Sequence, residues 1–249
     1  MKNISRFATG LVLSWLIVAG LSTPGVCLEP VRINTSIKPP FSTRHQNGFF
    51  DLLLKELFAR LDIQVELIRL PAERALQMAD DGYSDGDVPR IGGLSKQYPY
   101  LVAVPEPVID YNFVVFARKP AAQQMDWQLL AGRNVGIIIG WKIYEENVPG
   151  TAQVTRVAAP GQLLDLLSAE RIDFALYERY AGYHLLKSHD YADLVECSPP
   201  LAVRPMFLYL HKKHAELIKP LAIELRRMKE DGSWQRLAAQ TLGEAGAEK

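Results

Sequence analysis

The sequence predicts an α/β protein of two lobes, in which each lobe holds a mixed sheet flanked by helices and a two-strand hinge joins the lobes. Three observations predict this fold. Strand and helix patterns alternate along the chain, as they do in parallel β-α-β units. Two short apolar strands, residues 113–117 and 206–210, bracket the second series of such units. One helix–turn–strand pattern also occurs twice and ends in opposite charges.

The spacing of apolar residues indicates which segments are helices or strands, and in which order they follow. An apolar stripe at helical spacing fills residues 49–61 and follows Asn47-Gly48. Residues 64–70 alternate as a half-buried strand does, and Pro71 stands at the favoured first position of the next helix. The other expected elements are strands at 31–37, 134–139 and 153–157, and helices at 74–80, from about 142, at 162–169, 215–229 and 233–242.

The repeated pattern is RALQMADDGYSDGDVPR at residues 74–90 and QLLDLLSAERIDFALYER at residues 162–179. In each copy an aspartate follows the turn, and a charged residue stands five positions later at the end of the strand. The pair is Asp85 and Arg90 in the first copy, and Asp173 and Glu178 in the second. Open α/β sheets bind ligands beyond the carboxyl ends of their strands. If the copies lie in facing lobes, the two charges suit a small zwitterion such as an amino acid. The alternative is that both are solvated loop residues.

Length and composition fit a soluble globular chain. The chain has 249 residues, a formal net charge of zero, 48% hydrophobic residues and 22% charged residues. This size allows two lobes of about a hundred residues each. Neutrality argues against a nucleic-acid partner, because phosphate binding needs a basic face.

The first 27 residues have the three-part layout of a secretory signal peptide. Lys2 and Arg6 form a basic start, residues 8–21 are apolar, and residues 22–27 are small and turn-forming. The apolar run is short for a bilayer span of about 20 residues, although an uncleaved anchor is the alternative. We therefore expect a periplasmic protein, with lobe 1 at 28–112, lobe 2 at 113–204 and a return to lobe 1 at 205–249. Two cysteines, Cys27 and Cys197, exclude a disulfide framework, and whether Cys27 remains and pairs depends on the cleavage site.

The order of motifs resembles the family 3 solute-binding proteins, the periplasmic receptors that serve ABC importers of polar amino acids. The resembling segments are NGFFDLLLKEL, RALQMADDGYSDGD followed by PRI, FVVFARK, NVGIIIG, AERIDFAL and MKEDGSWQRL. The resemblance implies a monomer whose lobes close around a small solute by hinge motion, with a membrane ABC permease as its partner. It places Arg90 on the ligand α-carboxylate and Glu178 on the α-ammonium. The chain departs from the family at Asp87-Val88-Pro89, where a Thr-rich loop is usual, and at Glu178, where an aspartate is usual.

Other residues are candidates for the ligand site. Arg74 opens a helix and is a second candidate anion contact, with a surface cluster beside Glu73 or Asp80 as the alternative. Phe41 follows Pro40 in a loop expected to overhang the cleft, where its ring would pack a ligand or a cation unless it belongs to the core.

Two further candidates belong to the second lobe and the hinge. Gly140, Trp141 and Lys142 lie at a strand-to-helix junction, where helix amides and a lysine can hold an anion and the indole can cover the ligand. Tyr111 lies at the hinge, with a structural or a ligand-facing hydroxyl.

Catalytic and metal-binding signatures do not emerge from the sequence. It has no Gly-x-Ser-x-Gly elbow and no Cys/His cluster for zinc, so we expect neither an enzyme nor a cofactor. Two alternatives stay open. One is an enzyme on the same scaffold, similar to the periplasmic cyclohexadienyl dehydratases, with Glu178 as general acid. The other is a periplasmic sensor subunit that docks to a separate receptor.

Overall fold

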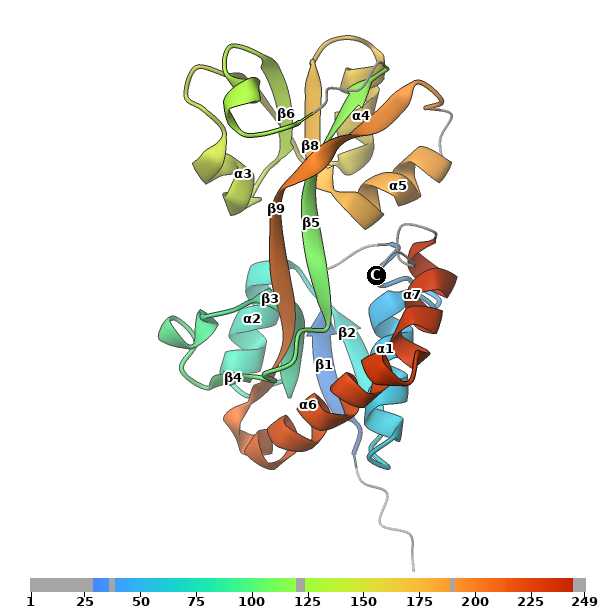
Figure 1. Ribbon diagram of the computed structural model, residues 1–249. Helices are drawn as coiled ribbons and strands as arrows, with labels where there is room; N and C mark the ends of the chain where they lie inside the picture. Colours follow the sequence, from blue (N-terminus) through green and yellow to red (C-terminus); the bar gives the residue numbers. More distant parts are fainter. Residues whose placement is uncertain (1–28, 36–38, 120–123, 189–190, 244–249) are drawn as a thin grey trace, which may run out of the picture.

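Two lobes joined by a pair of long strands make up the computed structural model, which describes residues 29–35, 39–119, 124–188 and 191–243. The predicted signal peptide and Cys27 lie outside these residues. Figure 1 shows β5 (Ile109–Arg118) and β9 (Leu194–His211) running side by side from one lobe into the other. The predicted two-lobe α/β fold is therefore confirmed, while the boundaries between the lobes stay a prediction.

Lobe 1 is formed by both ends of the described chain. Its strands are β1 (Val31–Thr35), β2 (Val65–Arg69), β3 (Gly86–Ile91) and β4 (Leu101–Ala103). Its helices are α1 (Phe49–Ala59), α2 (Ala72–Asp80), α6 (Ala215–Glu230) and α7 (Ser233–Leu242), with short 3-10 turns η1 (Leu94–Lys96) and η3 (Lys212–His214).

Lobe 2 contains the middle of the chain. Its strands are β6 (Asn134–Ile138), β7 (Gln153–Val157) and β8 (Phe174–Glu178). Its helices are α3 (Lys142–Asn147), α4 (Pro160–Ser168) and α5 (Arg179–Ser188), with the 3-10 turn η2 (Gln128–Leu130).

Hydrogen bonding connects the strands of both lobes in the order β2-β1-β3-β9-β5-β8-β6-β7, and β4 also pairs with β9. Pairing is parallel within each β-α-β series and antiparallel wherever β5 or β9 takes part. The carboxyl ends of β3 and β8 therefore point toward the boundary between the lobes. This topology places Arg90 and Glu178 at that boundary.

The two sequence repeats use their aspartates in the same way. Asp85 accepts the backbone N–H of Arg32 through Oδ2 at 2.7 Å, and its own amide donates to the carbonyl of Arg32. Asp173 does the same with Asn134, at 2.9 Å. Each aspartate therefore ties its turn to the first residues of the neighbouring parallel strand.

Helix α1 and the C-terminal helices bury the apolar stripes that the sequence predicts. In α1 the side chains of Phe49, Phe50, Leu53, Leu54, Leu57 and Phe58 are buried.

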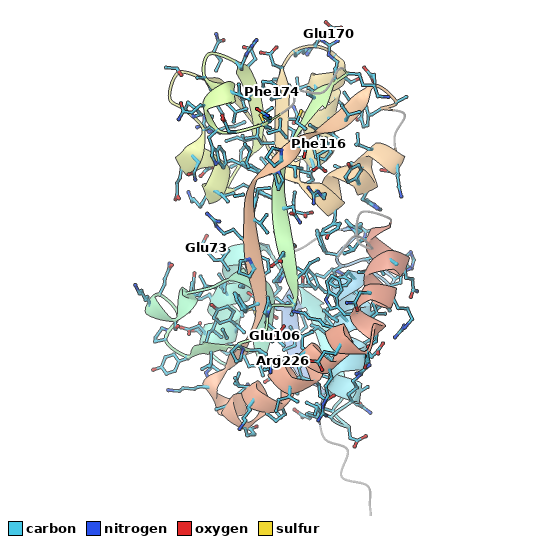
Figure 2. The ribbon with its side chains drawn as sticks, in the orientation of Figure 1. Glu73, Glu106, Phe116, Glu170, Phe174 and Arg226 are labelled. Atoms are coloured by element: carbon cyan, nitrogen blue, oxygen red, sulfur yellow. The ribbon has the colours of Figure 1, made fainter. Side chains whose placement is uncertain are left out.

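Figure 2 labels Glu106 and Arg226, which join the loop before β5 to α6 through an ion pair of 3.4 Å. Lys229 reinforces this link with a 2.6 Å contact to the same carboxylate. The C-terminal helices are thereby fixed in lobe 1 next to the start of the hinge.

Helix α5 and strand β4 are absent from the sequence prediction, and β9 is longer than predicted. Helix α5 was not expected, and its buried positions are Tyr180, Ala181 and Gly182 rather than a run of large aliphatic residues. The small Gly182 lets the helix approach the ring of Phe116 closely. Strand β4 was missed because it has only three residues, and the predicted strand 206–210 is only the C-terminal part of the 18-residue β9.

Candidate functional site

Glu178 is the last residue of β8 and directly precedes α5, and its side chain has no solvent exposure. Its Oε2 accepts the backbone N–H of Ala181 at 2.9 Å, so one oxygen caps α5. Its Oε1 has no hydrogen-bond partner among the residues that the structure describes. Burial raises the pKa of Glu178 to about 8, although the backbone amides of Ala181, Tyr180 and Asn112 and the Arg179 guanidinium oppose the rise. One half of this carboxyl is therefore structural, and the other is a buried acceptor at the lobe boundary.

Arg90 near the end of β3 is paired inside its own strand. Its Nε and Nη2 donate to Oδ2 of Asp87 at 2.9 and 2.7 Å, and Nη2 also donates to the carbonyl of Ala72 at 2.9 Å. In a regular strand, residues three apart face opposite sides of the sheet. Here three residue steps from Asp87 to Arg90 match two steps from Tyr209 to Phe207 on β9. This bulge turns both side chains to one face and permits the ion pair.

Asp87 is as deeply buried as Glu178, with no solvent exposure. Burial raises the pKa of Asp87 to about 7, against the opposing effect of the Arg90 guanidinium. Its Oδ2 is paired with Arg90, whereas its Oδ1 has no hydrogen-bond partner among residues 29–35, 39–119, 124–188 and 191–243. Asp87 is thus the partner of Arg90, the predicted receptor for a ligand carboxylate. The sequence marks the Asp87 position only as a departure from the family pattern.

Tyr111 of β5 connects the two predicted charges. The residue is 4% exposed, and its hydroxyl has no hydrogen-bond partner in the part of the chain that the structure describes. Burial is the main cause that raises the pKa of Tyr111 well above its usual value; the Glu178 carboxylate raises it further and the Arg90 guanidinium lowers it. The hydroxyl therefore lies within electrostatic reach of both residues. The structure brings Arg90, Tyr111 and Glu178 together.

A line of aromatic rings crosses from lobe 1 to lobe 2 through this cluster. Phe41 lies 5.0 Å from Tyr111 and meets Tyr180 of α5 edge-on at 6.2 Å. Phe113 follows Tyr111 by two positions on β5, and its ring lies 6.4 Å from that of Tyr111 and 6.0 Å from that of Trp141. All distances join ring centroids. Aromatic surface thus surrounds the buried polar atoms on both sides of the boundary.

The loop that carries Phe41 is held by Asp51 of α1. The fully buried Asp51 carboxylate accepts the hydroxyl of Ser42 at 2.7 Å, the amide of Thr43 at 2.8 Å and the amide of Gly48 at 2.9 Å. Phe41 itself is buried and stacks on Phe50 at 5.4 Å. The ring consequently belongs to the core of lobe 1 and to the wall of the site at once.

The predicted anion site at the start of α3 is filled by the chain itself. Glu145 accepts the Gly140 amide through Oε1 at 3.0 Å and the Lys142 ammonium through Oε2 at 3.0 Å. The Lys142 side chain is 75% exposed. Trp141 is half-buried and packs at 5.1 Å from Tyr177. Of the three predicted residues Gly140, Trp141 and Lys142, only Trp141 packs against the line of aromatic rings.

Arg74 is exposed on α2. No hydrogen bond or ion pair joins it to another described residue, so neither Glu73 nor Asp80 holds it. It lies in lobe 1, outside the buried group around Tyr111, and the structure shows no contact that would assign it to the site.

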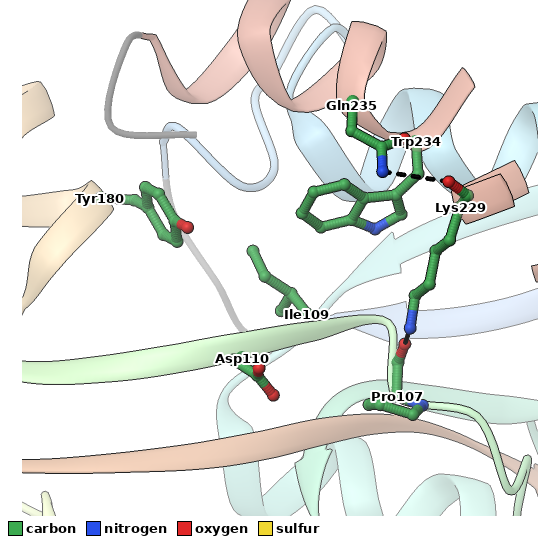
Figure 3. Close-up of a pocket in the computed structure, with 7 residues that line it drawn as sticks. All are labelled: Pro107, Ile109, Asp110, Tyr180, Lys229, Trp234 and Gln235. Carbon is green, nitrogen blue, oxygen red and sulfur yellow. Dashed lines mark hydrogen bonds between the residues drawn. The ribbon is translucent and has the colours of Figure 1, made fainter. Parts of the chain in front are cut away.

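A pocket of about 190 Å³ lies beside the cluster. Figure 3 shows Tyr180 of lobe 2 on one side of the pocket and Trp234 of α7 on the other, with Asp110 on β5. The indole of Trp234 donates to the Val108 carbonyl at 2.8 Å, which fixes that wall. The seven lining residues are Pro107, Ile109, Asp110, Tyr180, Lys229, Trp234 and Gln235. Sequence reasoning assigned none of them to a site, although Trp234 and Gln235 belong to the motif MKEDGSWQRL.

Metal binding and membrane insertion find no support in the part of the chain that the structure describes. Among these residues, no group of three or more His, Cys, Asp or Glu side chains could hold a metal ion. Their helices include none with the length and apolar character needed to cross a bilayer.

Comparison with known proteins defines the class of fold. No family model matches the sequence. An uncharacterized protein of Shewanella oneidensis is 25% identical over 250 aligned residues, which cover 96% of this chain and 94% of that protein.

Solved structures match the whole described architecture. The GluR0 ligand-binding core in complex with L-glutamate has a TM-score of 0.75 at 12% identity, over 87% of this chain and 100% of that one. An ancestral arginine-binding protein bound to glutamine has a TM-score of 0.68 at 19% identity, over 86% and 98%. The substrate-binding protein AbpA of an amino acid ABC transporter from Streptococcus pneumoniae, bound to L-arginine, has 0.68 at 17%, over 88% and 97%. The chain therefore has the two-lobe fold of the periplasmic binding proteins, and the predicted resemblance is confirmed at the level of the fold.

Proposed function

We propose that this protein is an extracytoplasmic solute-binding protein that holds a small solute with an ammonium group between its lobes. The observation that carries the proposal is the Glu178 carboxyl, which is fully buried at the lobe boundary and whose Oε1 finds no partner among the described residues. A buried acceptor without a donor is costly, so such groups mark places where a ligand completes the bonding. The Tyr111 hydroxyl beside it is unpartnered as well.

The finer parts of the proposal have separate support. The amino acids bound by the structural relatives carry the ammonium group that Glu178 would accept. The basic and apolar start of the sequence supports export to the periplasm. The motif order shared with the family 3 solute-binding proteins supports delivery of the solute, by a monomer, to a membrane ABC permease.

A thermal-shift screen tests the proposal. A ligand at a hundred times its dissociation constant stabilises the folded state by about 2.7 kcal/mol. We expect amines or amino acids to stabilise the wild-type protein and a Glu66→Gln control, because Glu66 is an exposed residue of β2. We expect Glu178→Gln to lose most of the stabilisation. Equal stabilisation of Glu178→Gln and the control would refute the site.

An enzyme on the same scaffold is the second candidate. It is favoured by the pKa of about 8 at Glu178, which keeps the carboxyl protonated at neutral pH, as a general acid must be. Incubation with prephenate and with arogenate discriminates the two. Release of product that depends on Glu178 would establish the enzyme, and recovery of both compounds unchanged would leave the binding protein.

A further inference from the structure

Two of the three places where the sequence predicts an anion contact, Arg90 and the start of α3, are occupied by carboxylates of the chain, and Arg74 is the third. Asp87 takes two donors of Arg90 at 2.9 and 2.7 Å. Glu145 takes the Gly140 amide and the Lys142 ammonium, each at 3.0 Å. The two receptors lie in different lobes and are filled independently. A ligand carboxylate would have to displace an internal ion pair at either place.

Arg90 is more firmly held than a surface ion pair. The Asp87 carboxylate has no exposure and the Arg90 side chain is only 12% exposed. A planar guanidinium bound through two nitrogens keeps its geometry better than a single contact does. Its Nη2 is also bound to the Ala72 carbonyl at 2.9 Å. Breaking the pair would leave a buried carboxylate without its counter-ion, which is strongly unfavourable.

In contrast to these anion receptors, the groups that would bind a ligand cation have oxygen atoms that are still available. Glu178 Oε1, the Tyr111 hydroxyl and Asp87 Oδ1 are buried, and no residue in the described part of the chain forms a hydrogen bond with them. Asp87, Arg90 and Glu178 together carry two potential negative charges against one positive charge. A charged amine brings the missing positive charge and up to three N–H donors. An added carboxylate would bring a further negative charge.

Aromatic walls suit the same kind of ligand. Phe41, Tyr111 and Phe113 line one run of rings, with Trp141 and Tyr180 on the side of lobe 2. The face of an aromatic ring attracts an ammonium or guanidinium and offers nothing to a carboxylate.

We propose that the solute is an amine cation without the α-carboxylate of an amino acid, and that Asp87 occupies the place at Arg90 where that carboxylate would bind. This inference rests on the proposed function, since it names the solute class of the same site. It assigns to Asp87 the role of an internal counter-ion that sets specificity.

Matched pairs of probes test the inference on the wild-type protein. Putrescine and ornithine, agmatine and arginine, and phenethylamine and phenylalanine each differ by the α-carboxylate alone. Isothermal titration is expected to show at least one amine binding more tightly than its amino acid by on the order of tenfold or more. If every amino acid binds as tightly as its amine, the inference fails and the proposed function stands. If none of the six compounds binds, both fail.

The variant Asp87→Asn tests the cause. It keeps the size of the side chain and removes the charge, so Arg90 becomes available to a carboxylate. We expect the preference to move toward the amino acid of the pair by about tenfold or more, while the control Glu66→Gln keeps the wild-type preference. An unchanged preference in a folded Asp87→Asn protein would overturn the role of Asp87. Tight binding of an amino acid to the wild type that is lost in Arg74→Ala would also overturn the inference, because Arg74 would then be the carboxylate receptor.

Discussion

The Tyr111 hydroxyl on β5 and the Glu178 carboxyl on β8 lie within electrostatic reach of each other, and both bury a polar oxygen that no described residue satisfies. The Glu178 carboxylate makes the Tyr111 hydroxyl harder to ionise, because burial of the hydroxyl and the nearby negative charge act in the same direction. The relationship joins the strand that crosses between the lobes to the strand that ends in lobe 2.

Glu178 should make the protein less stable as the pH rises. Its pKa is about 8 in the folded chain and near 4.5 in an unfolded one. The folded state therefore binds more protons between these values, and the free energy of unfolding falls with pH there by up to about 1.4 kcal/mol per unit. Arg179 and the amides of α5 favour the charged form, while Tyr111, Tyr144, Tyr177 and Tyr180 face the carboxyl without compensating its charge.

Urea unfolding of wild type and Glu178→Gln from pH 4 to pH 9 measures this slope. The variant is expected to gain relative stability as the pH rises through that window, since it cannot ionise. Parallel curves for the two proteins would show that Glu178 titrates as an ordinary surface carboxyl.

Amine binding should release a proton below pH 8. The bound cation favours the ionised form of Glu178, so affinity is expected to rise between pH 6 and pH 8 and to level off above the pKa of about 8. Titration calorimetry in two buffers with different ionisation enthalpies measures the proton released per amine bound. Glu178→Gln should show none; release of the same size in that variant would place the titrating group elsewhere.

Two buried tyrosines should respond oppositely to loss of their hydroxyls. Tyr144 donates to the Tyr177 carbonyl at 2.6 Å, so Tyr144→Phe is expected to cost about 1–2 kcal/mol of unfolding free energy. The Tyr111 hydroxyl has no partner, so Tyr111→Phe should leave stability unchanged or raise it, while it weakens ligand binding. Chemical denaturation of both variants measures the contrast. A similar loss of stability in Tyr111→Phe would mean that its hydroxyl is bonded within the protein.

Asp51 should control both the loop of Phe41 and the affinity of the site. Its carboxylate accepts three hydrogen bonds from that loop and is fully buried. Asp51→Ala is expected to cost about 2–3 kcal/mol, because buried donors lose their acceptor. Thermal unfolding and ligand titration measure the two effects, with exposed Glu66→Gln as the control. Unchanged affinity in a destabilised variant would separate Phe41 from the site.

Gly182 should tolerate no larger side chain. A Cβ there would lie inside van der Waals contact of the Phe116 ring, whereas a Cβ on Gly161 of α4 meets nothing within 4 Å. Gly182→Ala is expected to cost about 1–3 kcal/mol through overpacking. Gly161→Ala should be neutral or slightly stabilising, because alanine is the better helix former. Equal stability of the two variants would contradict the close packing of α5 on β5.

The sequence predicted the helices and strands that have a clear pattern of apolar residues of their own. The stripe of α1 and the C-terminal helices were found within a few residues of their bounds, and the apolar strands of the hinge indicated two lobes. Helix α5 was missed, because it depends on a glycine fitted against Phe116 rather than on an apolar stripe. The aspartates Asp85 and Asp173 were recognised as a repeat, but their partners belong to strands about forty to fifty residues away.

The sequence by itself determined that two β-α-β units end in Arg90 and Glu178, since the strand period and the turn chemistry are local properties. Only the tertiary structure decided what those charges face. A bulge against β9 turned Arg90 onto Asp87, Glu145 filled the start of α3, and the packing of β5 against β8 buried Glu178 beside Tyr111. Burial and pairing depend on residues distant along the chain, and no pattern within one segment encodes them.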